Sequence, residues 1–393
     1  MIKNDSNELL TRGVEEIFIR KDLEAKLTSG KKLRVKFGID PTSPFIHLGR
    51  AVPLRKLKAF QDLGHNVVLI MGDFTAKIGD PSDKLEKRPM LTAKEIKSNL
   101  KNYLKQIGLI LNMKKVEIHY NSEWFAKMDL LEIGKLLECF TVQQMGKRRN
   151  FKERLDAGTD VFLVEFMYPA LQGYDSVEVK ADVEIGGFDQ LFNLKAGRIV
   201  QRRYGQAEQD IMTLSMIEGT DGRKMSSSWG NIIGITDSPD EMFGKVMSLR
   251  DDLILKYFLL CTDLPMLTIE GYARDMAEGA NPRDLKMILG KELVALYHSK
   301  KSADKAQESF IAKFKNKEIP DDAPKIKSNK GELLVDVFMK NKIIASKNEF
   351  RRLVDEGAIT NLDTNKKIKE YTAQAENGVY RIGKKRFCNI KLS

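Results

Sequence analysis

Apolar positions in the first part of the chain follow two alternating periods, which predict strands separated by helices. Residues 33–40 (LRVKFGID) predict a strand, and residues 66–74 (NVVLIMGDF) form a continuous apolar run of the kind found in buried parallel strands. Between them, apolar residues recur at helical spacing over 48–63. A strand, a helix and a second strand in this order predict a right-handed βαβ unit.

A second unit of this kind is predicted by a strand at 177–187 and a helix at 188–205. Residues 5–30 predict one charged amphipathic helix, and residues 94–174 look mainly helical. The predicted fold class is therefore α/β, with a Rossmann-like, doubly wound parallel sheet in a first domain at 1–235 that carries the helical insertion.

The pattern changes after about residue 235, where only helical periods are found. We expect a helical domain at 236–314 and a linker at 315–331, a stretch with two prolines and almost no apolar residues. The last segment, 332–393, predicts two helices followed by short strands. Its apolar residues are enough for a core, so we expect a separate small α+β module.

Composition narrows the class of protein. The 393 residues, 42% hydrophobic and 31% charged, are typical of a globular chain of two or three domains. The net charge of +11 favours an anionic partner, with nucleic acid as the first candidate and a solubility charge as the alternative. The scattered cysteines and histidines predict no disulfide framework, no bound metal and a cytoplasmic location. No run reaches the roughly 18 apolar residues of a membrane span, so no membrane partner is expected.

The first candidate site is His47-Leu48-Gly49-Arg50, at the start of a predicted helix. A helix N-terminus presents free N–H groups and partial positive charge, which suit a phosphate. His47 can donate to a triphosphate without a full charge, and Gly49 lets a nucleotide lie against the backbone. Pro53 in the second turn predicts a kink or a later helix start. Alone, the pattern also fits an ordinary helix start.

The second candidate site is the segment 224–228 (KMSSS) in a polar, glycine-flanked loop. Such a loop can close over a phosphate chain, with Lys224 neutralising charge. Taken alone, a solvated surface turn is the alternative.

Together, the two motifs, each beside a βαβ unit, resemble those of the class I aminoacyl-tRNA synthetases. Residues 168–190 (YPALQGYDSVEVKADVEIGGFDQ) and 72–88 (GDFTAKIGDPSDKLEKR) are similar to the bacterial tyrosyl-tRNA synthetases, and the similarity extends over nearly the whole chain. The resemblance implies a tyrosine–tRNA ligase. Such an enzyme activates L-tyrosine with ATP and Mg²⁺ to tyrosyl-adenylate, releases pyrophosphate and transfers tyrosine to the 3′ end of tRNA(Tyr).

The resemblance also implies roles for individual residues. Tyrosine would be bound by Asp80, Tyr168, Gln172, Asp175 and Gln190. ATP would be bound by Asp40, His47, Gly49, Arg50, Gly187, Asp189, Lys224, Met225, Ser226 and Ser227. Charge developing on the phosphates would be stabilised by Thr42, His47, Lys84, Arg88 and Lys224.

The spacing of the residues expected to bind tyrosine is consistent with that role. Tyr168, Gln172 and Asp175 are separated by four and three positions, so they can share one helix face. Asp175 would accept the phenol hydroxyl, and phenylalanine would be rejected because it leaves a buried carboxylate unpaired. Without the other motifs, an ordinary helix surface is the alternative. The alternative for Gly-Gly-x-Asp-Gln is a strand-to-helix turn capped by aspartate. The alternative for Lys84 and Arg88 is a solvated charged loop.

Three positions depart from the family pattern. Arg50 stands where most relatives have His or Asn, and Ser227 where many bacterial relatives have Lys. Lys36 stands where some relatives place a tyrosine that shares the substrate hydroxyl, so we expect Asp175 to recognise that hydroxyl with less help.

The segment 332–393 resembles the alpha-L RNA-binding module first seen in a ribosomal small-subunit protein, and 236–314 would be the anticodon-binding-type domain. Residues 331–393 hold 13 basic and 8 acidic residues. RNA phosphates would be bound by Arg351, Arg352, Lys384, Lys385 and Arg386. A solubilising tail is the alternative. The resemblance further implies a homodimer, with helices between about 125 and 170 at the interface.

Two other functions fit parts of the pattern. A tryptophanyl-tRNA synthetase shares the fold and Gly-Gly-x-Asp-Gln, but such enzymes usually lack the C-terminal module and the Gln172–Asp175 spacing. A non-catalytic RNA-binding paralogue would be compatible with Arg50 and Ser227. Tyrosine-dependent ATP–pyrophosphate exchange separates the three.

Overall fold

A six-stranded sheet with the order β1-β6-β5-β2-β3-β4 forms the centre of the first part of the chain. The computed structural model describes residues 2–81, 92–226, 229–318, 323–364, 366–383 and 386–392. Five strands run parallel and β1 pairs with β6 in the antiparallel sense. The strands are β1 (Val14–Ile17), β2 (Arg34–Ile39), β3 (Asn66–Met71), β4 (Val116–Tyr120), β5 (Val183–Gly187) and β6 (Asp210–Leu214).

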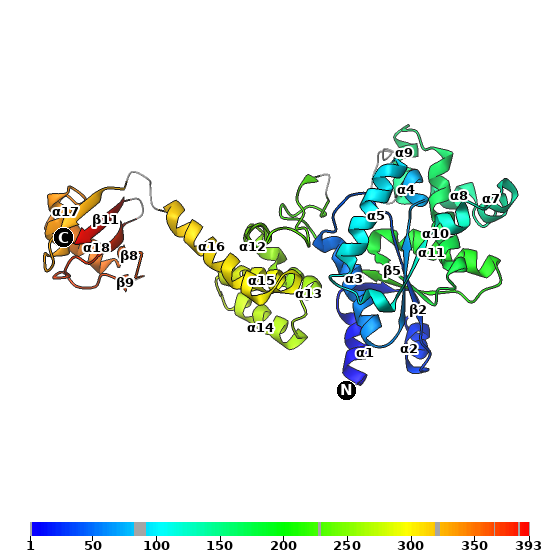
Figure 1. Cartoon of the computed structure of the whole chain (residues 1–393), viewed down its shortest axis with the longest axis horizontal. Coiled ribbons are helices and arrows are strands. Elements are labelled where there is room, and N and C mark those ends of the chain that lie inside the picture. The colour runs from blue at the N-terminus through cyan, green and yellow to red at the C-terminus, as the bar shows by residue number, and fades with distance from the viewer. Residues whose placement is uncertain are drawn as a thin grey trace. The chain divides into compact units, whose positions relative to one another are not determined.

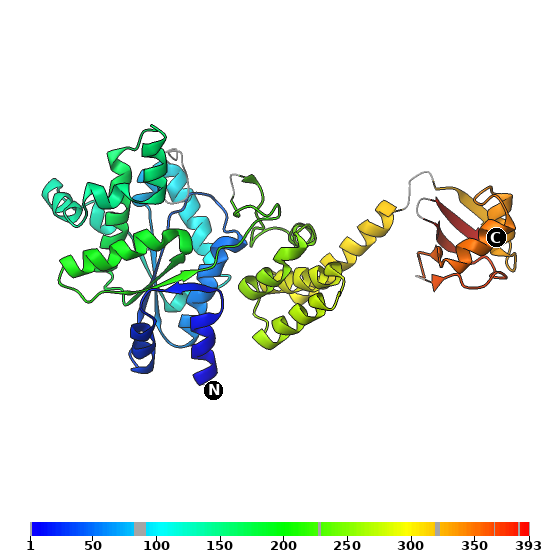
Figure 2. The ribbon, with the colours of Figure 1, turned by 180° about the vertical axis from the view of Figure 1, so that it is seen from behind.

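The sheet is wound in both directions from its middle. From β2 the chain runs through α3 (Leu48–Asp62) to β3 and through α5 (Ala93–Ile107) toward β4, whereas from β5 it runs through α11 (Leu191–Arg203) to β6. Because parallel crossovers are right-handed, the two directions place helices on opposite faces. Figures 1 and 2 show α3 and α5 on one face, and α10 (Leu163–Glu178) with α11 on the other. The predicted doubly wound α/β fold class is confirmed.

The predicted strands and helices hold in part. The strand predicted at 177–187 begins later, since α10 continues to Glu178 and β5 starts at Val183. The prediction of one helix over 5–30 is wrong, because α1 (Ile2–Thr11) and α2 (Arg20–Thr28) flank β1. Gly13 has a φ of 65°, which ends the first helix.

The insertion after β4 consists of short helices, and the stretch after β6 is helical. The insertion holds α6 (Ser122–Phe125), α7 (Leu130–Leu137), α8 (Val142–Gly146) and α9 (Arg149–Asp156). The later helices are α12 (Pro239–Met247), α13 (Ile254–Cys261), α14 (Met266–Ala277), α15 (Pro282–Tyr297) and α16 (Lys300–Glu318). The remaining short elements are α4 (Thr75–Ile78) and the 3₁₀ turns Met113–Lys115, Phe188–Gln190 and Asp251–Leu253.

One arginine connects the N-terminal segment to this helical stretch. The Arg12 guanidinium donates to the carbonyl oxygens of Leu259 at 2.9 Å, Thr262 at 2.7 Å and Leu264 at 2.9 Å. These carbonyls lie at the end of α13, where the last backbone acceptors of a helix lack intrahelical donors. The helical stretch is therefore bonded to the chain segment that leads into β1.

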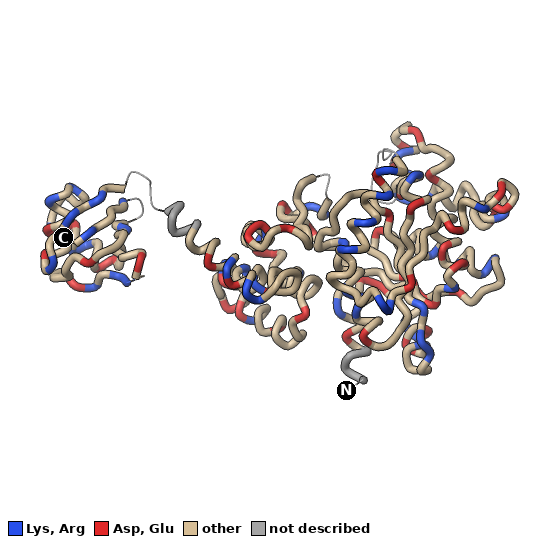
Figure 3. The backbone as a smooth tube through the Cα atoms, viewed as in Figure 1, with Lys and Arg blue, Asp and Glu red and all other residues tan. Residues whose placement is uncertain are grey.

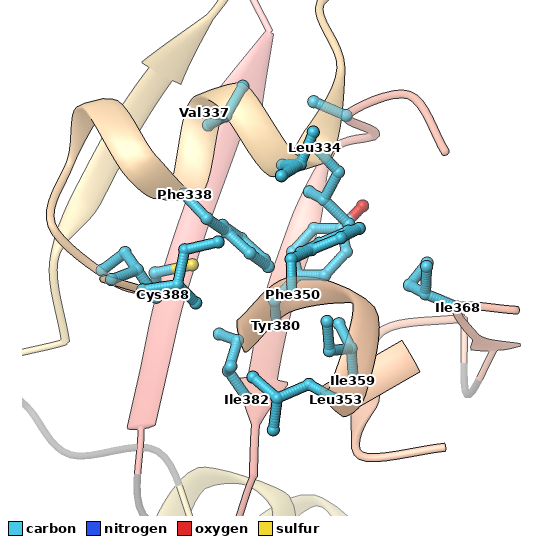
Figure 4. Packing of buried hydrophobic residues seen from close by; sticks show 14 of the residues in the cluster. Leu334, Val337, Phe338, Phe350, Leu353, Ile359, Ile368, Tyr380, Ile382 and Cys388 are labelled. Carbon is cyan, nitrogen blue, oxygen red and sulfur yellow. The ribbon is translucent and has the colours of Figure 1, made fainter. Parts of the chain in front are cut away.

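By its contacts, the chain divides into two units, Met1–Ala306 and Gln307–Ser393. The second unit has its own sheet, in the order β7-β11-β10-β8-β9. Its elements are β7 (Lys325–Ser328), α17 (Leu334–Lys340), α18 (Lys347–Asp355), β8 (Ile359–Asn361), β9 (Lys366–Lys367), β10 (Gly378–Ile382) and β11 (Arg386–Leu392). Figure 4 shows Phe338, Phe350 and Tyr380 among the apolar side chains of its core, all at most 1% exposed. Such a core supports independent folding.

The stretch 315–331, predicted as a linker, contains β7. Ile326 and Ser328 are buried whereas Lys325 and Lys327 are exposed, which is the alternation of an edge strand. Four residues directly after Pro324 gave too short a pattern to recognise in the sequence. Among the described residues, no helix has both the length and the apolar character to cross a membrane.

Candidate active site

A cavity of about 500 Å³ opens where the sheet changes winding direction. It is lined by Asp40 directly after β2, Gly72 directly after β3 and Gly187 at the end of β5. In doubly wound sheets, ligands bind beyond the carboxyl ends of the strands at this switch point. The volume is in the range of small-molecule and cofactor sites.

The structure brings the predicted site residues together in this one cavity. Its lining includes Asp40, Thr42, His47, Gly49, Arg50, Asp80, Tyr168, Gln172, Asp175, Gly187, Asp189, Gln190, Lys224, Met225 and Ser226. The other predicted site residues, Lys84, Arg88 and Ser227, lie outside the described residues. Residues more than 170 positions apart thus share one surface, which is what a bound ligand requires.

His47 is the N-cap of α3, and the helix continues through Pro53. Burial, together with the Arg50 and Lys224 charges, lowers the pKa of the His47 imidazole to about 3. The ring is therefore neutral at physiological pH. Its buried Nδ1 has no hydrogen-bond partner among the described residues. A neutral imidazole with an unused ring nitrogen can bond an incoming phosphate oxygen without carrying a charge.

Arg50 lies one turn into the same helix. Its Nη2 donates to Thr42 Oγ1 at 2.8 Å, and its guanidinium lies 5.7 Å from the centre of the Tyr103 ring. The cation–π contact and the hydrogen bond hold the charge at the cavity wall. Arg50 therefore presents a fixed positive charge on the same side as His47.

The loop lysine also lines the cavity. Lys224 Nζ lies 2.9 Å from Asp189 Oδ2. Asn231 binds the backbone of this loop: its side chain accepts from Ser226 N at 2.8 Å and donates to Lys224 O at 3.1 Å. Gly49 N also contacts Met225 Sδ at 3.3 Å, so the two motifs touch each other.

A carboxylate cluster forms the next part of the cavity. Asp80 accepts from Gln190 Nε2 at 2.7 Å and from Asn193 Nδ2 at 3.4 Å, and Arg148 Nη2 lies 3.9 Å away. Tyr168 donates its hydroxyl to Asp40 Oδ2 at 3.0 Å. Two carboxylates and a phenol at one wall suit an ammonium group.

Thr75 links Asp40 to this cluster, and sequence reasoning did not find it. Its Oγ1 donates to Asp40 Oδ1 at 2.8 Å and accepts from Asn121 Nδ2 at 2.9 Å. A Cβ at Gly72 would lie 1.9 Å from Asp40 Oδ1, so only glycine allows this contact. Threonine and asparagine are common surface residues, and nothing in their spacing distinguishes these two.

Asp175 lies at the deep end, 3% exposed. Its Oδ1 accepts from Trp124 Nε1 at 3.0 Å. Burial raises the pKa of the Asp175 carboxyl to about 7, and the Lys36 charge and the Trp124 and Asn121 hydrogen bonds oppose this rise. Trp124 was also missed, because a tryptophan after β4 gives no signal of its partner in the sequence.

Lys36 does not line the cavity. Its side chain is fully buried behind α10 and pairs with Glu184 at 2.9 Å. In this chain the side chain at position 36 is therefore not part of the cavity lining, and the expectation that Asp175 meets the substrate hydroxyl with less help stays a prediction.

In the second unit, the arginines predicted to bind RNA also make contacts within the unit itself. Arg351 lies 6.0 Å from the Tyr371 ring, and Arg352 lies 3.8 Å from Glu356. Arg386 donates to Ile343 O at 2.7 Å and to Glu349 at 2.8 Å. Lys384 and Lys385 lie outside the described residues. Figure 3 shows Lys and Arg spread over several elements of this unit, between acidic positions.

Comparison with known proteins agrees with this geometry. Residues 28–315 match the family described as tRNA synthetases class I (W and Y). The chain is 44% identical over 393 residues to a tyrosine–tRNA ligase of Thermotoga maritima, covering 99% of this chain and 98% of that one. It is 45% identical over 400 residues to a tyrosine–tRNA ligase of Carboxydothermus hydrogenoformans, covering 98% and 97%.

Solved structures share the fold. The tyrosyl-tRNA synthetase of Archaeoglobus fulgidus, complexed with L-tyrosine, has a TM-score of 0.63 at 23% identity and covers 78% of this chain and 100% of that one. A C-terminally truncated mitochondrial tyrosyl-tRNA synthetase of Aspergillus nidulans has a TM-score of 0.64 at 22% identity, covering 79% and 94%. With the family match over most of the chain and relatives above 40% identity over its full length, the chain belongs to the class I tRNA synthetases and, within them, to the tyrosine–tRNA ligases.

Proposed function

We propose that the chain activates L-tyrosine with ATP and transfers the tyrosyl group to the 3′ end of tRNA(Tyr). One observation carries this proposal: phosphate donors and amino-acid acceptors line a single cavity. His47, Arg50 and Lys224 lie on the donor side, and Asp80 and Asp175 on the acceptor side. The function of the relatives supports the same reaction.

The first step joins the two substrates. A carboxylate oxygen of tyrosine attacks the α-phosphorus of ATP, the bond from that phosphorus to the bridging oxygen breaks, and pyrophosphate leaves with the Mg²⁺ that accompanies ATP. No protein nucleophile takes part. The residues act by positioning and by stabilising charge on the phosphates, with Lys224, His47, Arg50 and Thr42 as donors.

Lys224 changes partner during this step. In the structure it is paired with Asp189. When ATP is bound, Asp189 accepts hydrogen bonds from the ribose hydroxyls and Lys224 moves to the leaving phosphates. The predicted roles of Lys84, Arg88 and Ser227 in this step rest on family resemblance alone.

The tyrosine substrate is bound through its ammonium group and its phenol hydroxyl, beside its reacting carboxylate. Its ammonium is held by Asp80, Tyr168 and Gln172, with Gln190 beside the reacting carboxylate, and its phenol donates to Asp175. In the second step a hydroxyl of the terminal adenosine of the tRNA attacks the tyrosyl carbonyl, and AMP leaves as the carbonyl–phosphate bond breaks.

The rest of the chain would bind the tRNA body. We assign 236–314 to anticodon binding and 332–393 to RNA phosphate contacts, through the exposed Arg351 and Arg352 of α18 together with Arg386, Lys384 and Lys385. The +11 net charge supports a polyanionic partner. The reaction would take place in the cytoplasm, where three free cysteines are compatible with the reducing conditions.

The protein would act as a homodimer. Exposed apolar side chains lie on α7 to α10, among them Leu130 and Leu163, each 83% exposed. Exposed apolar side chains on neighbouring helices are typical of interfaces, and they fall within the helices expected to meet a second copy. Leu131→Asp combined with Leu163→Asp should halve the mass measured by light scattering, whereas Leu267→Asp on α14 should leave it unchanged.

Tyrosine-dependent ATP–pyrophosphate exchange tests the reaction. We expect exchange with tyrosine and none with tryptophan. Asp175→Ala should lower kcat/KM for tyrosine by roughly 100-fold or more, because an unpaired phenol is left in a buried site. Glu178→Ala, an exposed carboxylate on the same helix, is the matched control. Exchange driven by tryptophan, or RNA binding without any exchange, would refute the proposal.

A further inference from the structure

A buried ion pair lies directly behind the phenol end of the cavity. Lys36 of β2 and Glu184 of β5 are register partners on adjacent parallel strands. Their side chains are 0% and 1% exposed and meet at 2.9 Å. Neither residue lines the cavity. Burying two charges is costly, so such a pair needs a reason beyond stability.

The lysine is saturated by three acceptors. Its ammonium donates to Gln172 O at 2.8 Å, Ser176 Oγ at 2.8 Å and Glu184 Oε1 at 2.9 Å. A lysine ammonium has three N–H groups, so each is used. Two of the acceptors belong to α10, the helix that carries the tyrosine-binding side chains. The pair therefore fixes this helix against the two central strands.

The glutamate is equally well held. Glu184 accepts from Gln172 Nε2 at 3.1 Å and Ser176 Oγ at 3.3 Å, and also from Gln209 Nε2. Gln172 thus contacts the pair through its backbone carbonyl and its side chain, while lining the cavity. Displacing either charged residue would change the position of a side chain expected to bind substrate.

The pair also controls the charge next to Asp175. From β2 the Lys36 charge favours the ionised form of Asp175, and from β5 the Glu184 charge opposes it. On α10 itself, the pKa of the Tyr168 hydroxyl is raised by burial and in part by the Asp175 charge. Trp124 of α6 and Asn121 before it supply neutral hydrogen bonds. Lys36 is thus the one positive charge that acts on Asp175 among these groups.

We propose that Lys36 and Glu184 are positioning residues for substrate selection: the pair orients α10 and sets the charge next to Asp175, the acceptor of the phenol hydroxyl. The ammonium does this without contacting the ligand, so no substrate group can displace it. This inference rests on the proposed function, and it assigns phenol selectivity to a charge outside the cavity.

The two charges have opposite expected effects on the pH profile of tyrosine activation. In wild type, kcat/KM for tyrosine should rise with pH around the Asp175 pKa of about 7. Lys36→Met should move the inflection upward by about one unit or more, because Asp175 loses its positive neighbour. Glu184→Gln should move it downward. In the double variant Lys36→Met/Glu184→Gln the inflection should return close to its original position.

Selectivity for tyrosine over phenylalanine should change together with the ionisation of Asp175. At pH 7, Lys36→Met should lower the ratio of kcat/KM for tyrosine to that for phenylalanine about 10-fold, and raising the pH to 8.5 should restore much of it. Lys31→Met is the matched control, since it removes a lysine–carboxylate pair at the surface, 2.6 Å from Asp182. Asp175→Asn should abolish the inflection and thereby identify the titrating group.

A purely structural pair would behave differently. Equal losses at every pH with an unchanged inflection, or shifts in the same direction for Lys36→Met and Glu184→Gln, would overturn the inference. If Lys36→Met does not fold, Glu184→Gln and the double variant still decide it through the direction of their shifts. Absence of tyrosine-dependent exchange in wild type would instead refute the proposed function.

Discussion

Lys224 Nζ and Asp189 Oδ2 lie 2.9 Å apart across the mouth of the cavity. The pair joins the loop that carries Lys224 to the turn after β5. Both side chains are about one-third exposed or less, so the pair can open without a large desolvation penalty.

Lys224→Met should remove a charge needed mainly when pyrophosphate departs. We expect kcat for exchange to fall roughly 100- to 1,000-fold while the KM for tyrosine changes little. Steady-state exchange kinetics at saturating ATP would measure this. Lys245→Met is the matched control, because Lys245 forms a similar pair with Asp237 at 2.7 Å outside the cavity lining. A large increase in the KM for tyrosine alone would contradict the assigned role.

His47 should act as a neutral donor. With its pKa lowered to about 3, its ring gains no proton in the folded state as pH falls through 6.5, whereas the unfolded chain does. Stability is therefore lost as pH falls below 6.5 and is unaffected by this group above it. His47→Gln should remove this loss, which amounts to about 2 kcal/mol at pH 5.

Urea unfolding of wild type and His47→Gln at pH 5 and pH 7.5 would test this, with the exposed His298→Gln as the control. The free energy of unfolding of His47→Gln relative to that of wild type should be higher at pH 5 than at pH 7.5. His47→Gln should also retain more exchange activity than His47→Ala, since glutamine keeps an N–H donor. Equal stability differences at both pH values would show that His47 is protonated in the folded state.

Asp175 should reduce stability at neutral and alkaline pH. Its pKa is raised to about 7, so the folded state binds a proton more tightly than the unfolded chain. The stability this provides is present at low pH and is lost as pH rises from about 4 through 7. Asp175→Asn should therefore unfold at a higher temperature than wild type above pH 7 and should retain only residual tyrosine activation.

The gain in stability for Asp175→Asn should be on the order of 1–3 kcal/mol at pH 8 and should vanish near pH 4. Thermal unfolding across this range measures it, with Glu178→Gln as the exposed control on the same helix. A variant less stable than wild type at pH 8 would mean that the ionised carboxylate stabilises the fold.

The second unit should matter for RNA and not for activation. A chain ending at residue 318 keeps α16 and the whole cavity, so tyrosine-dependent exchange should stay within about twofold of the full-length rate. Charging of tRNA should fall by roughly 10-fold or more at low salt, and the loss relative to the full-length chain should become smaller at higher salt, because salt weakens the phosphate contacts that the shortened chain lacks. Unchanged charging would contradict RNA binding by this unit.

Phe338→Ala in the full-length chain is the companion variant. Phe338 is 0% exposed in the core of the second unit, so truncation should cost about 3–5 kcal/mol there. We expect it to reproduce the charging defect while leaving exchange intact, and circular dichroism should show a separate, lower unfolding transition for this unit.

Several parts of the fold could be predicted because the signal is local. The buried runs that became β2 and β3 are continuous in sequence, and the helix starting at His47 follows a strand-to-helix change of period. The right-handed crossover rule then predicts the face of the sheet on which each connecting helix lies. The order of the strands was not predicted and comes from the structure.

Other parts could not be predicted because their cause lies in distant partners. β1 is a strand since it pairs with β6, about 200 positions later, and its own residues fit a helix as well. Trp124 and Asn121 reach Asp175 only after the insertion folds back on α10. In the sequence, Lys36 appeared only as the absence of a tyrosine that some relatives have there. The structure shows that its charge is buried and paired with Glu184.

The Arg12 guanidinium, bonded to the carbonyl oxygens of Leu259, Thr262 and Leu264, has a consequence for engineering. A chimaera that receives the helices after residue 235 from another synthetase would place foreign carbonyls opposite this arginine. Exchange of those helices should therefore succeed best when the N-terminal segment containing Arg12 is transplanted with them, since Arg12 binds the backbone at the end of α13.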